Sequence, residues 1–120
     1  MNASEASILI VDDNEINLNL LYRYLVRKDG YTVTAAENGR QALELIESQP
    51  FDLVLLDLLM PDLSGYDVLK ILRQNYSITE LPIIMLTAKQ ESEALVDTLQ
   101  LGANDWFNYI IICPELQGVH

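Results

Sequence analysis

The sequence predicts an α/β protein with a parallel β-sheet that is covered by helices on both faces. Short apolar runs alternate along the chain with longer segments in which apolar residues recur at helical spacing. The apolar runs lack the polar alternation of half-exposed strands, which is typical of strands buried on both faces of a parallel sheet. A chain of 120 residues, half of them hydrophobic, is ample for one domain of this kind and short for two.

The first half of the chain contains three predicted strands and two predicted helices. The run Ile8–Val11 is rich in β-branched residues, and Asp12-Asp13-Asn14 after it end the strand and cap a helix. Gly30 ends that helix, Asn38-Gly39 marks a turn, and Pro50 ends the second helix. The predicted elements are a strand at 8–11, a helix at 15–28, a strand at 31–36, a helix at 41–48 and a strand at 53–56.

The second half of the chain continues the alternation. Ser64 is a helix cap, Pro82 precedes another fully apolar run, and Gly102 stops a further helix. The predicted elements are a helix from 65 to about 75, a strand at 83–86, a helix at 91–101 and a last apolar run at 106–112.

Charge and cysteine content restrict the classes of function. Seven basic against eighteen acidic residues give a net charge of −11, which argues against binding nucleic acid or an anionic membrane through bulk charge. Cys113 is the single cysteine, so no disulfide forms within the chain, as suits a reducing cytosol. Residues 1–7 are polar and acidic, unlike a signal peptide, and no apolar run approaches the ~20 residues that cross a bilayer. We therefore expect a cytoplasmic protein whose partners are basic or are reached through an apolar face.

One carboxylate, that of Asp57, lies in an otherwise unbroken apolar run. Ionising an isolated buried carboxylate is costly, so the group must be neutral, paired, bound to a cation or placed at the end of its element. Pro61 cannot continue a central strand, so we expect Asp57 at the carboxyl end of the strand that begins at Leu53. Open α/β sheets present their ligand sites at this edge.

Polar residues also follow two other predicted strands. Asp12 and Asp13 follow the first strand and Thr87 follows Ile83–Leu86, so we expect these side chains to converge with Asp57. Three crowded carboxylates repel one another, which raises at least one pKa unless a cation intervenes. Oxygen ligands favour a hard cation such as Mg²⁺, and a carboxylate beside Mg²⁺ with a hydroxyl nearby is suited to accept a phosphoryl group.

These motifs, in this order, resemble the receiver domain of two-component response regulators, a CheY-like family. The resemblance covers roughly residues 7 to 108. The matching segments are Asp12-Asp13 after a strand, Asp57 before the stretch 58–65, Thr87-Ala88, and Gly102-Ala103-Asn104-Asp105.

The resemblance implies a doubly wound five-stranded parallel sheet of order 2-1-3-4-5, with the site at its switch point. It implies that Asp57 takes a phosphoryl group from the phosphohistidine of a sensor histidine kinase or histidine phosphotransfer protein, forming an aspartyl phosphate. It also implies that Thr87 and Trp106 switch after phosphorylation, and that the module is regulatory rather than an enzyme. The implied cofactor is Mg²⁺ or Mn²⁺, held by Asp12, Asp13, Asp57 and the backbone carbonyl of Leu59.

Each of these residues, taken alone, has a simpler interpretation. Asp12 and Asp13 are also typical of the start of a helix, where acidic side chains are favoured. Asp57 alone fits a loop carboxylate, Thr87 alone fits a strand end without chemistry, and Trp106 alone fits a core residue. The conjunction favours the functional interpretation, because helix caps do not predict the matching signals on other strands.

The C-terminus departs from the family pattern. A Lys-Pro dipeptide is expected after the last strand, but Tyr109 and Ile110 occupy those places, and no Lys or Arg follows Lys89. The final helix is also short or missing, because Pro114–His120 provides barely two turns. We therefore expect one receiver domain over 1–120, with a flexible segment at 1–6 and an atypical tail at 113–120. A truncated or frame-shifted C-terminus would explain the departure.

Three functions remain in competition. The first is a phosphoryl-accepting module of a phosphorelay, and the second is a degenerate receiver that acts as a binding module without phosphorylation, since the Lys is absent. The third is an Asp-nucleophile phosphatase, which is disfavoured because Leu59 stands where a second Asp is needed. A flavodoxin-like flavin site is disfavoured because the first loop is acidic rather than hydroxyl- and Gly-rich.

Two surfaces are predicted to bind partners. Leu18, Tyr22 and Val26 form a second apolar stripe on the first helix, which we expect to dock a kinase or phosphotransfer helix. The apolar segment 106–113, without a covering helix, predicts self-association through the C-terminal face. The output domain, the kinase and the pathway are not encoded in this sequence.

Overall fold

The computed structural model describes residues 6–29, 31–87 and 92–108, and for 27–29, 87, 92–96 and 106–108 it describes the backbone only. Strands and helices alternate throughout, as predicted. The strands are β1 Ser7–Val11, β2 Thr32–Ala36, β3 Leu53–Asp57, β4 Ile83–Thr87 and β5 Asp105–Asn108. The helices are α1 Glu15–Asp29, α2 Gly39–Ser48, α3 Gly65–Leu72 and α4 Ser92–Leu101.

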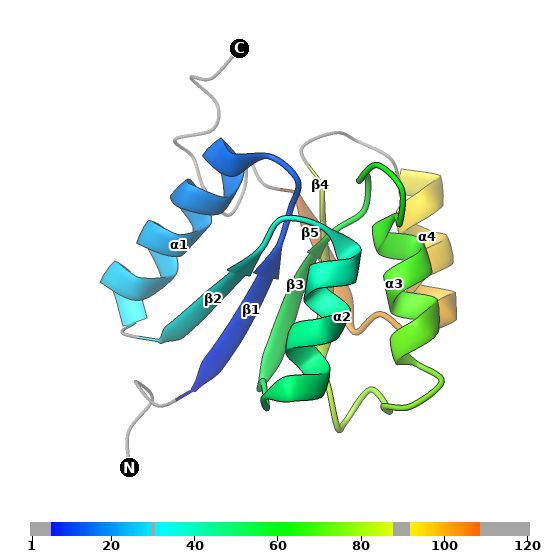
Figure 1. The fold of residues 1–120 in the computed structure, drawn as a ribbon. Coiled ribbons are helices and arrows are strands. Elements are labelled where there is room, and N and C mark those ends of the chain that lie inside the picture. Colours follow the sequence, from blue (N-terminus) through cyan, green and yellow to red (C-terminus); the bar gives the residue numbers. More distant parts are fainter. Residues whose placement is uncertain (1–5, 30, 88–91, 109–120) are drawn as a thin grey trace.

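The five strands form one parallel sheet of order β2-β1-β3-β4-β5. Helix α1 covers one face, while α2, α3 and α4 cover the other (Figure 1). This confirms the predicted α/β fold class and strand order. The chain order reverses between β1 and β3, so the carboxyl ends of these two strands form the switch point at which such sheets bind ligands.

The central strands are apolar on both sides because both faces of the sheet are covered. Leu9 and Val11 pack into the core beneath α2 and α3, whereas Ile8 and Ile10 pack against α1. The edge strand β2 is covered less completely, and its Thr32 is exposed. This difference explains why β2 shows polar alternation in the sequence while β1 and β3 do not.

Capping side chains set the starts of α2 and α3. Ser64 accepts a hydrogen bond from the amide of Asp67, whose carboxylate accepts one from the amide of Ser64 in return, forming a capping box. Asn38 and Gly39, predicted as a turn, instead begin α2: the Asn38 side chain accepts from the amide of Gln41. Helix α2 therefore starts two residues earlier than predicted, because the turn residues serve as its cap and first turn.

The carboxyl end of α3 is joined to the loop before β5 by Arg73. Its Nε donates to the carbonyl of Gly102 (2.8 Å), its Nη1 to the carbonyl of Leu81 (2.9 Å) and its Nη2 to Oδ1 of Asn104 (3.0 Å). Asn104 Oδ1 also accepts from the amide of Ile83, at the start of β4 (2.9 Å). We call this group the Arg73 clasp, and it lies at the edge of the sheet opposite the carboxyl ends of the strands.

Several predictions concern residues outside the described part of the chain. The short or missing final helix, the atypical tail at 113–120 and the residue at position 109 all lie there. So do residues 1–5 of the segment expected to be flexible. Ala6 is described, and its carbonyl accepts a hydrogen bond from the amide of Thr32 (2.9 Å). Among the described residues, no helix is long and apolar enough to cross a membrane.

Candidate metal centre at the carboxyl edge of the sheet

Three carboxylates meet where β1 and β3 end. The two strands pair in register, with Val11 opposite Leu56, so Asp12 and Asp57 occupy equivalent positions at the ends of neighbouring strands. One oxygen from each of Asp12, Asp13 and Asp57 lies within 4.8 Å of the others. The structure thus brings together the three acidic side chains that the sequence led us to expect at one edge.

Asp12 is held in place by its surroundings. It is 1% exposed, and its carboxylate accepts hydrogen bonds from the amide of Asn14 (2.8 Å) and from Nδ2 of Asn17 (3.3 Å). The cap of α1 is Asn14, whose Oδ1 accepts from the amides of Ile16 (2.9 Å) and Asn17 (3.2 Å). Because Asn14 performs the capping, the simpler interpretation of Asp12 and Asp13 as helix caps does not account for their position.

The site is electrostatically unfavourable for three ionised carboxylates. Burial and, to a smaller extent, the charges of Asp12 and Asp13 together raise the pKa of Asp57 to about 8. Hydrogen bonds from the backbone amides of Leu59 and Leu58 oppose this rise by stabilising the charged form. Asp57 is 8% exposed, so solvent does little to relieve the repulsion. A cation at the centre of the three groups would favour their ionised forms.

The donor set fits a hard divalent cation. All three groups offer oxygen, which is what Mg²⁺ and Mn²⁺ take, and opposite oxygens in an octahedral Mg²⁺ site lie about 4.2 Å apart, from bonds of about 2.1 Å. The three carboxylate oxygens lie within 4.8 Å of one another, which is close to that separation of opposite ligands. Asp13 is exposed while Asp12 and Asp57 are buried, so the cluster faces solvent on one side only. A cation bound there would meet solvent on the side of Asp13.

The loop between β3 and α3 is folded tightly against the end of β3. Gly65 donates its amide to the carbonyl of Leu58 (2.9 Å), and a Cβ at Gly65 would overlap the backbone carbonyl of Asp57. Asp62, in the same loop, has a φ of 66°, which non-glycine residues rarely adopt. Gly65 positions the main chain of Asp57 although it has no reactive side chain. The sequence feature that could have revealed it is the Ser64-Gly65 pair after the acidic motif.

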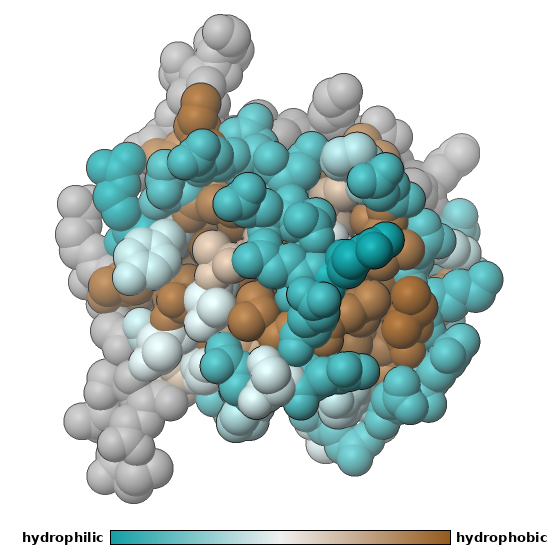
Figure 2. Space-filling model, in the orientation of Figure 1, coloured by the Kyte–Doolittle hydropathy of each residue, from teal (hydrophilic) through white to brown (hydrophobic). Residues whose placement is uncertain are grey.

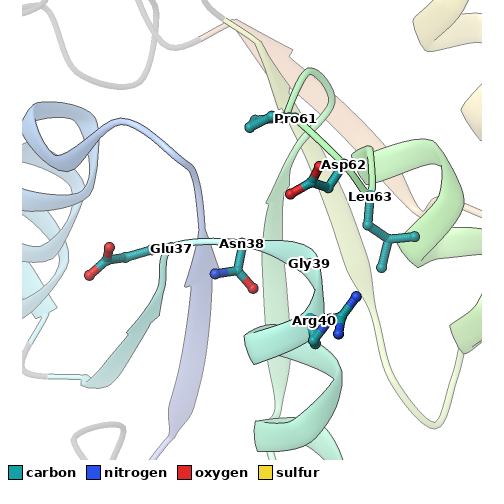
Figure 3. Close-up of a pocket in the computed structure, with 7 residues that line it drawn as sticks. All are labelled: Glu37, Asn38, Gly39, Arg40, Pro61, Asp62 and Leu63. Atoms are coloured by element: carbon teal, nitrogen blue, oxygen red, sulfur yellow. The ribbon is translucent and has the colours of Figure 1, made fainter.

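A pocket of about 370 Å³ lies beside this loop (Figure 3). It is lined by the loop before α2, at 37–40, and by Pro61, Asp62 and Leu63. The side chains of Asp62 and Arg40 reach toward the gap from its two sides. Asp62 is exposed. The pocket could not be predicted from the sequence, because it is formed by two loops that become neighbours only when β2, β1 and β3 assemble.

The backbone places the predicted switch residues on β4 and β5. Asp57 pairs with Leu86, so Thr87 ends β4 at the same edge as the carboxylates, and it pairs in turn with Asn108. Trp106 pairs with Met85, further from that edge. Leu59 lies two residues after Asp57, and its amide is hydrogen-bonded to the Asp57 carboxylate. The metal-binding role of the Leu59 carbonyl and the roles of Thr87 and Trp106 stay predictions.

The predicted partner stripe on α1 is wrong at Leu18. That side chain is 6% exposed and packs with Leu21 against β1, β3 and β4. Tyr22 and Val26 are exposed, at 45% and 37%. The sequence pattern was ambiguous because α1 is apolar around much of its circumference, and the sheet determines which side is buried. Only Tyr22 and Val26 of the stripe are available to a partner.

A doubly wound parallel sheet with an acidic, oxygen-lined site at its switch point defines the class of protein. The family model described as the response regulator receiver domain matches residues 8–108, and the chain belongs to this family. It is therefore the receiver domain of a two-component response regulator.

Curated relatives are longer proteins. The chain is 39% identical over 115 residues to a "Probable cyclic di-GMP phosphodiesterase" of Vibrio cholerae, covering 96% of this chain and 26% of that protein. It is 43% identical over 99 residues to the alkaline phosphatase synthesis transcriptional regulatory protein PhoP of Bacillus subtilis, covering 82% of this chain and 40% of that protein. The chain thus spans well under half the length of these relatives.

A solved structure of similar size matches nearly end to end. The chemotaxis response regulator CheY4 of Vibrio cholerae is 30% identical, with a TM-score of 0.79 over 97% of this chain and 99% of that chain. The likeness supports the fold and the family together.

Proposed function

We propose that this receiver domain accepts a phosphoryl group on the carboxylate of Asp57 in the presence of Mg²⁺ or Mn²⁺. The observation that carries the proposal is the meeting of one oxygen each from Asp12, Asp13 and Asp57 within 4.8 Å at the switch point. The donor is the phosphohistidine of a sensor histidine kinase or histidine phosphotransfer protein, the partners with which receiver domains generally interact. The domain acts as a regulatory module in the cytoplasm, and the only reactions that it assists are its own phosphorylation and dephosphorylation.

The residues of this chain have separate tasks in the transfer. An oxygen of ionised Asp57 attacks phosphorus, the bond from phosphorus to the donor imidazole nitrogen breaks, and that nitrogen leaves with the bonding electron pair. The amide of Leu59 favours the ionised form of the Asp57 carboxylate, and the amide of Leu58 donates to the carbonyl of Leu86 (3.1 Å), which ties the residue after Asp57 to β4. Asp12, Asp13, Asp57 and the Leu59 carbonyl hold the cation, which when bound neutralises charge on the carboxylates and the phosphoryl group.

Residues on the neighbouring strands β4 and β5 would then respond to the aspartyl phosphate. Thr87 follows Leu86, the residue that pairs with Asp57, at the end of β4, and we propose that Thr87 responds to the phosphoryl group and that Trp106 on the adjacent β5 follows. Self-association through the apolar segment 106–113 is part of the proposal and rests on its sequence alone. Sedimentation velocity at high protein concentration tests this self-association, and a strictly monomeric profile would contradict it.

Intact-protein mass spectrometry after treatment with acetyl phosphate and Mg²⁺ tests the phosphoacceptor. One labile phosphoryl group is expected on the wild type and none on Asp57→Asn. Asp62→Asn is the matched control, since Asp62 is an exposed carboxylate on the same loop, and it should remain phosphorylated. Phosphorylation that persists in Asp57→Asn would refute the assignment.

A second candidate, a binding module that works without phosphorylation, is favoured by one observation. Tyr109 stands where the family pattern has a Lys that meets the phosphoryl group. If neither the wild type nor Tyr109→Lys forms an adduct, this second function replaces the first.

A further inference from the structure

A groove of about 420 Å³ runs between α2 and α3, at the end of these helices remote from the acidic site. Figure 2 shows apolar surface over these two helices, framed by hydrophilic residues. The groove is lined from α2 by Leu43, Ile46 and Glu47, and from α3 and the turn after it by Ile71, Leu72, Asn75 and Tyr76. It is separate from the cluster of carboxylates, since it lies beside the last turns of both helices and the cluster lies near their first turns.

The floor of the groove belongs to the rigid core. Ile46 and Leu72 are buried and pack with the residues of the central strands, so a partner would meet a surface that already exists. Ile71 on the rim is 37% exposed, while Leu43 and Tyr76 are half-buried. The rim thus offers apolar contact area that is still open to solvent.

The α2 side of the groove carries negative charge. Helices α2 and α3 both run back along parallel strands of one sheet, so their carboxyl ends, which carry negative partial charge, lie at the same end of the domain. Helix α2 has no basic residue in its last turn, and the exposed Glu47 adds a full negative charge there. At the end of α3, Lys70 and the Arg73 guanidinium, which donates to the carbonyl of Tyr76 (3.3 Å), offset the partial charge, so the negative side of the groove is the α2 side.

We propose that this groove docks an amphipathic helix of a partner protein that carries apolar anchors on one face and Lys or Arg beside them. The apolar floor accepts the anchors, as grooves between helices do, and the basic side chain meets Glu47 and the carboxyl end of α2. A second copy of this chain that paired groove to groove would bring its own acidic rim, with Glu47, against this one, which makes it a poor occupant. The proposal is independent of phosphoryl transfer and assigns the domain a second, constitutive binding face.

The test uses a synthetic amphipathic helix with leucines on one face and lysines beside them, and a matched peptide in which glutamate replaces each lysine. Amide chemical shifts of the full chain locate binding, and fluorescence anisotropy measures the Kd. The lysine peptide should shift the last turns of α2 and α3, and bind at least about tenfold more tightly than the glutamate peptide. Asp57→Asn should bind it as the wild type does, which separates this result from the proposed phosphoryl transfer.

Two pairs of variants locate the contact. Glu47→Lys and Ile71→Ser should each raise the Kd by about tenfold. The controls, Asp97→Lys at an exposed acid on α4 and Ile78→Ser at an exposed apolar residue outside the groove, should leave the Kd unchanged. Circular dichroism establishes that each variant is folded. Absence of shifts at the two helix ends, equal affinity for both peptides, insensitivity to Glu47→Lys and Ile71→Ser, or a dimer that occupies this face in solution would each overturn the proposal.

Discussion

Gly65, the first residue of α3, lies so close to Asp57 that a side chain on it would overlap the backbone carbonyl of Asp57. Gly65 also donates its amide to the next carbonyl, that of Leu58 (2.9 Å). The start of α3 therefore packs directly on the main chain of Asp57, the proposed phosphoacceptor. The position of Asp57 depends on a residue that has no reactive group.

The first prediction tests this contact. Gly65→Ala should lower the free energy of unfolding by about 1–3 kcal/mol, because the new methyl group must displace the backbone of β3 or α3. Denaturant unfolding measures the loss, and phosphorylation by acetyl phosphate should slow in the protein that remains folded. Ser64→Ala, which removes the adjacent cap but adds no atoms, should cost about 1 kcal/mol and leave the phosphorylation rate near that of the wild type. Equal rates in both variants would contradict the positioning role of Gly65.

The second prediction concerns pH in the absence of divalent cations. The pKa of Asp57 is raised from its ordinary value of 3.8 to about 8, so the folded protein keeps a proton that the unfolded chain releases. The stabilisation from this proton is complete below about pH 4 and is lost as pH rises toward about 8. The melting temperature should therefore fall across this window. Asp57→Asn should flatten this part of the profile, and a wild-type melting temperature that rises over the window would show the sign to be wrong.

The third prediction concerns the cation itself. Mg²⁺ should raise the melting temperature, since binding to the folded state alone stabilises it by about 2.7 kcal/mol at a hundredfold excess over the Kd. Asp13→Asn should largely abolish the rise while leaving a folded protein, because Asp13 is the exposed member of the cluster. Glu15→Gln, an exposed acid two residues away, serves as the control. Identical melting with and without Mg²⁺ would rule out the metal centre.

The fourth prediction concerns position 109, where the sequence has Tyr in place of the Lys of the family pattern. One charge-assisted hydrogen bond to the phosphoryl group is worth on the order of 1.5–3 kcal/mol, so wild-type phosphorylation should be slow and incomplete. Tyr109→Lys should raise the occupancy and enlarge the change in fluorescence of Trp106, the single tryptophan. Full occupancy in the wild type would show that the missing Lys has no such role.

The fifth prediction concerns the exposed part of α1. Tyr22→Ala combined with Val26→Ala should slow phosphotransfer from a histidine kinase and leave phosphorylation by acetyl phosphate unchanged, because both side chains are exposed. Ile78→Ala, at another exposed apolar residue, should affect neither reaction. If the double variant slows both donors equally, the surface has no part in recognising the kinase.

The sequence predicted the parts of the fold that depend on hydrophobic patterning. Strands β1, β3 and β4 were identifiable because burial on both faces leaves them apolar throughout, and the meeting of Asp12, Asp13 and Asp57 followed from the parallel sheet. The rotation of α1 about its own axis could not be predicted, because apolar residues surround much of that helix. Only contact with the sheet decides that Leu18 is buried and Tyr22 is exposed.

Other features have no local sequence signal at all. Most acceptors of the Arg73 clasp are backbone carbonyls, which every residue possesses, so the sequence does not reveal its partners. The groove between α2 and α3 depends on how two helices pack side by side. Such features follow from the assembled tertiary structure.

The Arg73 clasp has a consequence for how the domain opens. The guanidinium links the end of α3, the residues before β4 and the loop before β5, and Asn104 adds a direct bond between the last two through the amide of Ile83 (2.9 Å). These segments should therefore open together rather than one by one, as a single cooperative unit. Amides at the beginnings of β4 and β5 should exchange with solvent deuterium with the same opening free energy. In Arg73→Met, the exchange of β5 should become faster than that of β4.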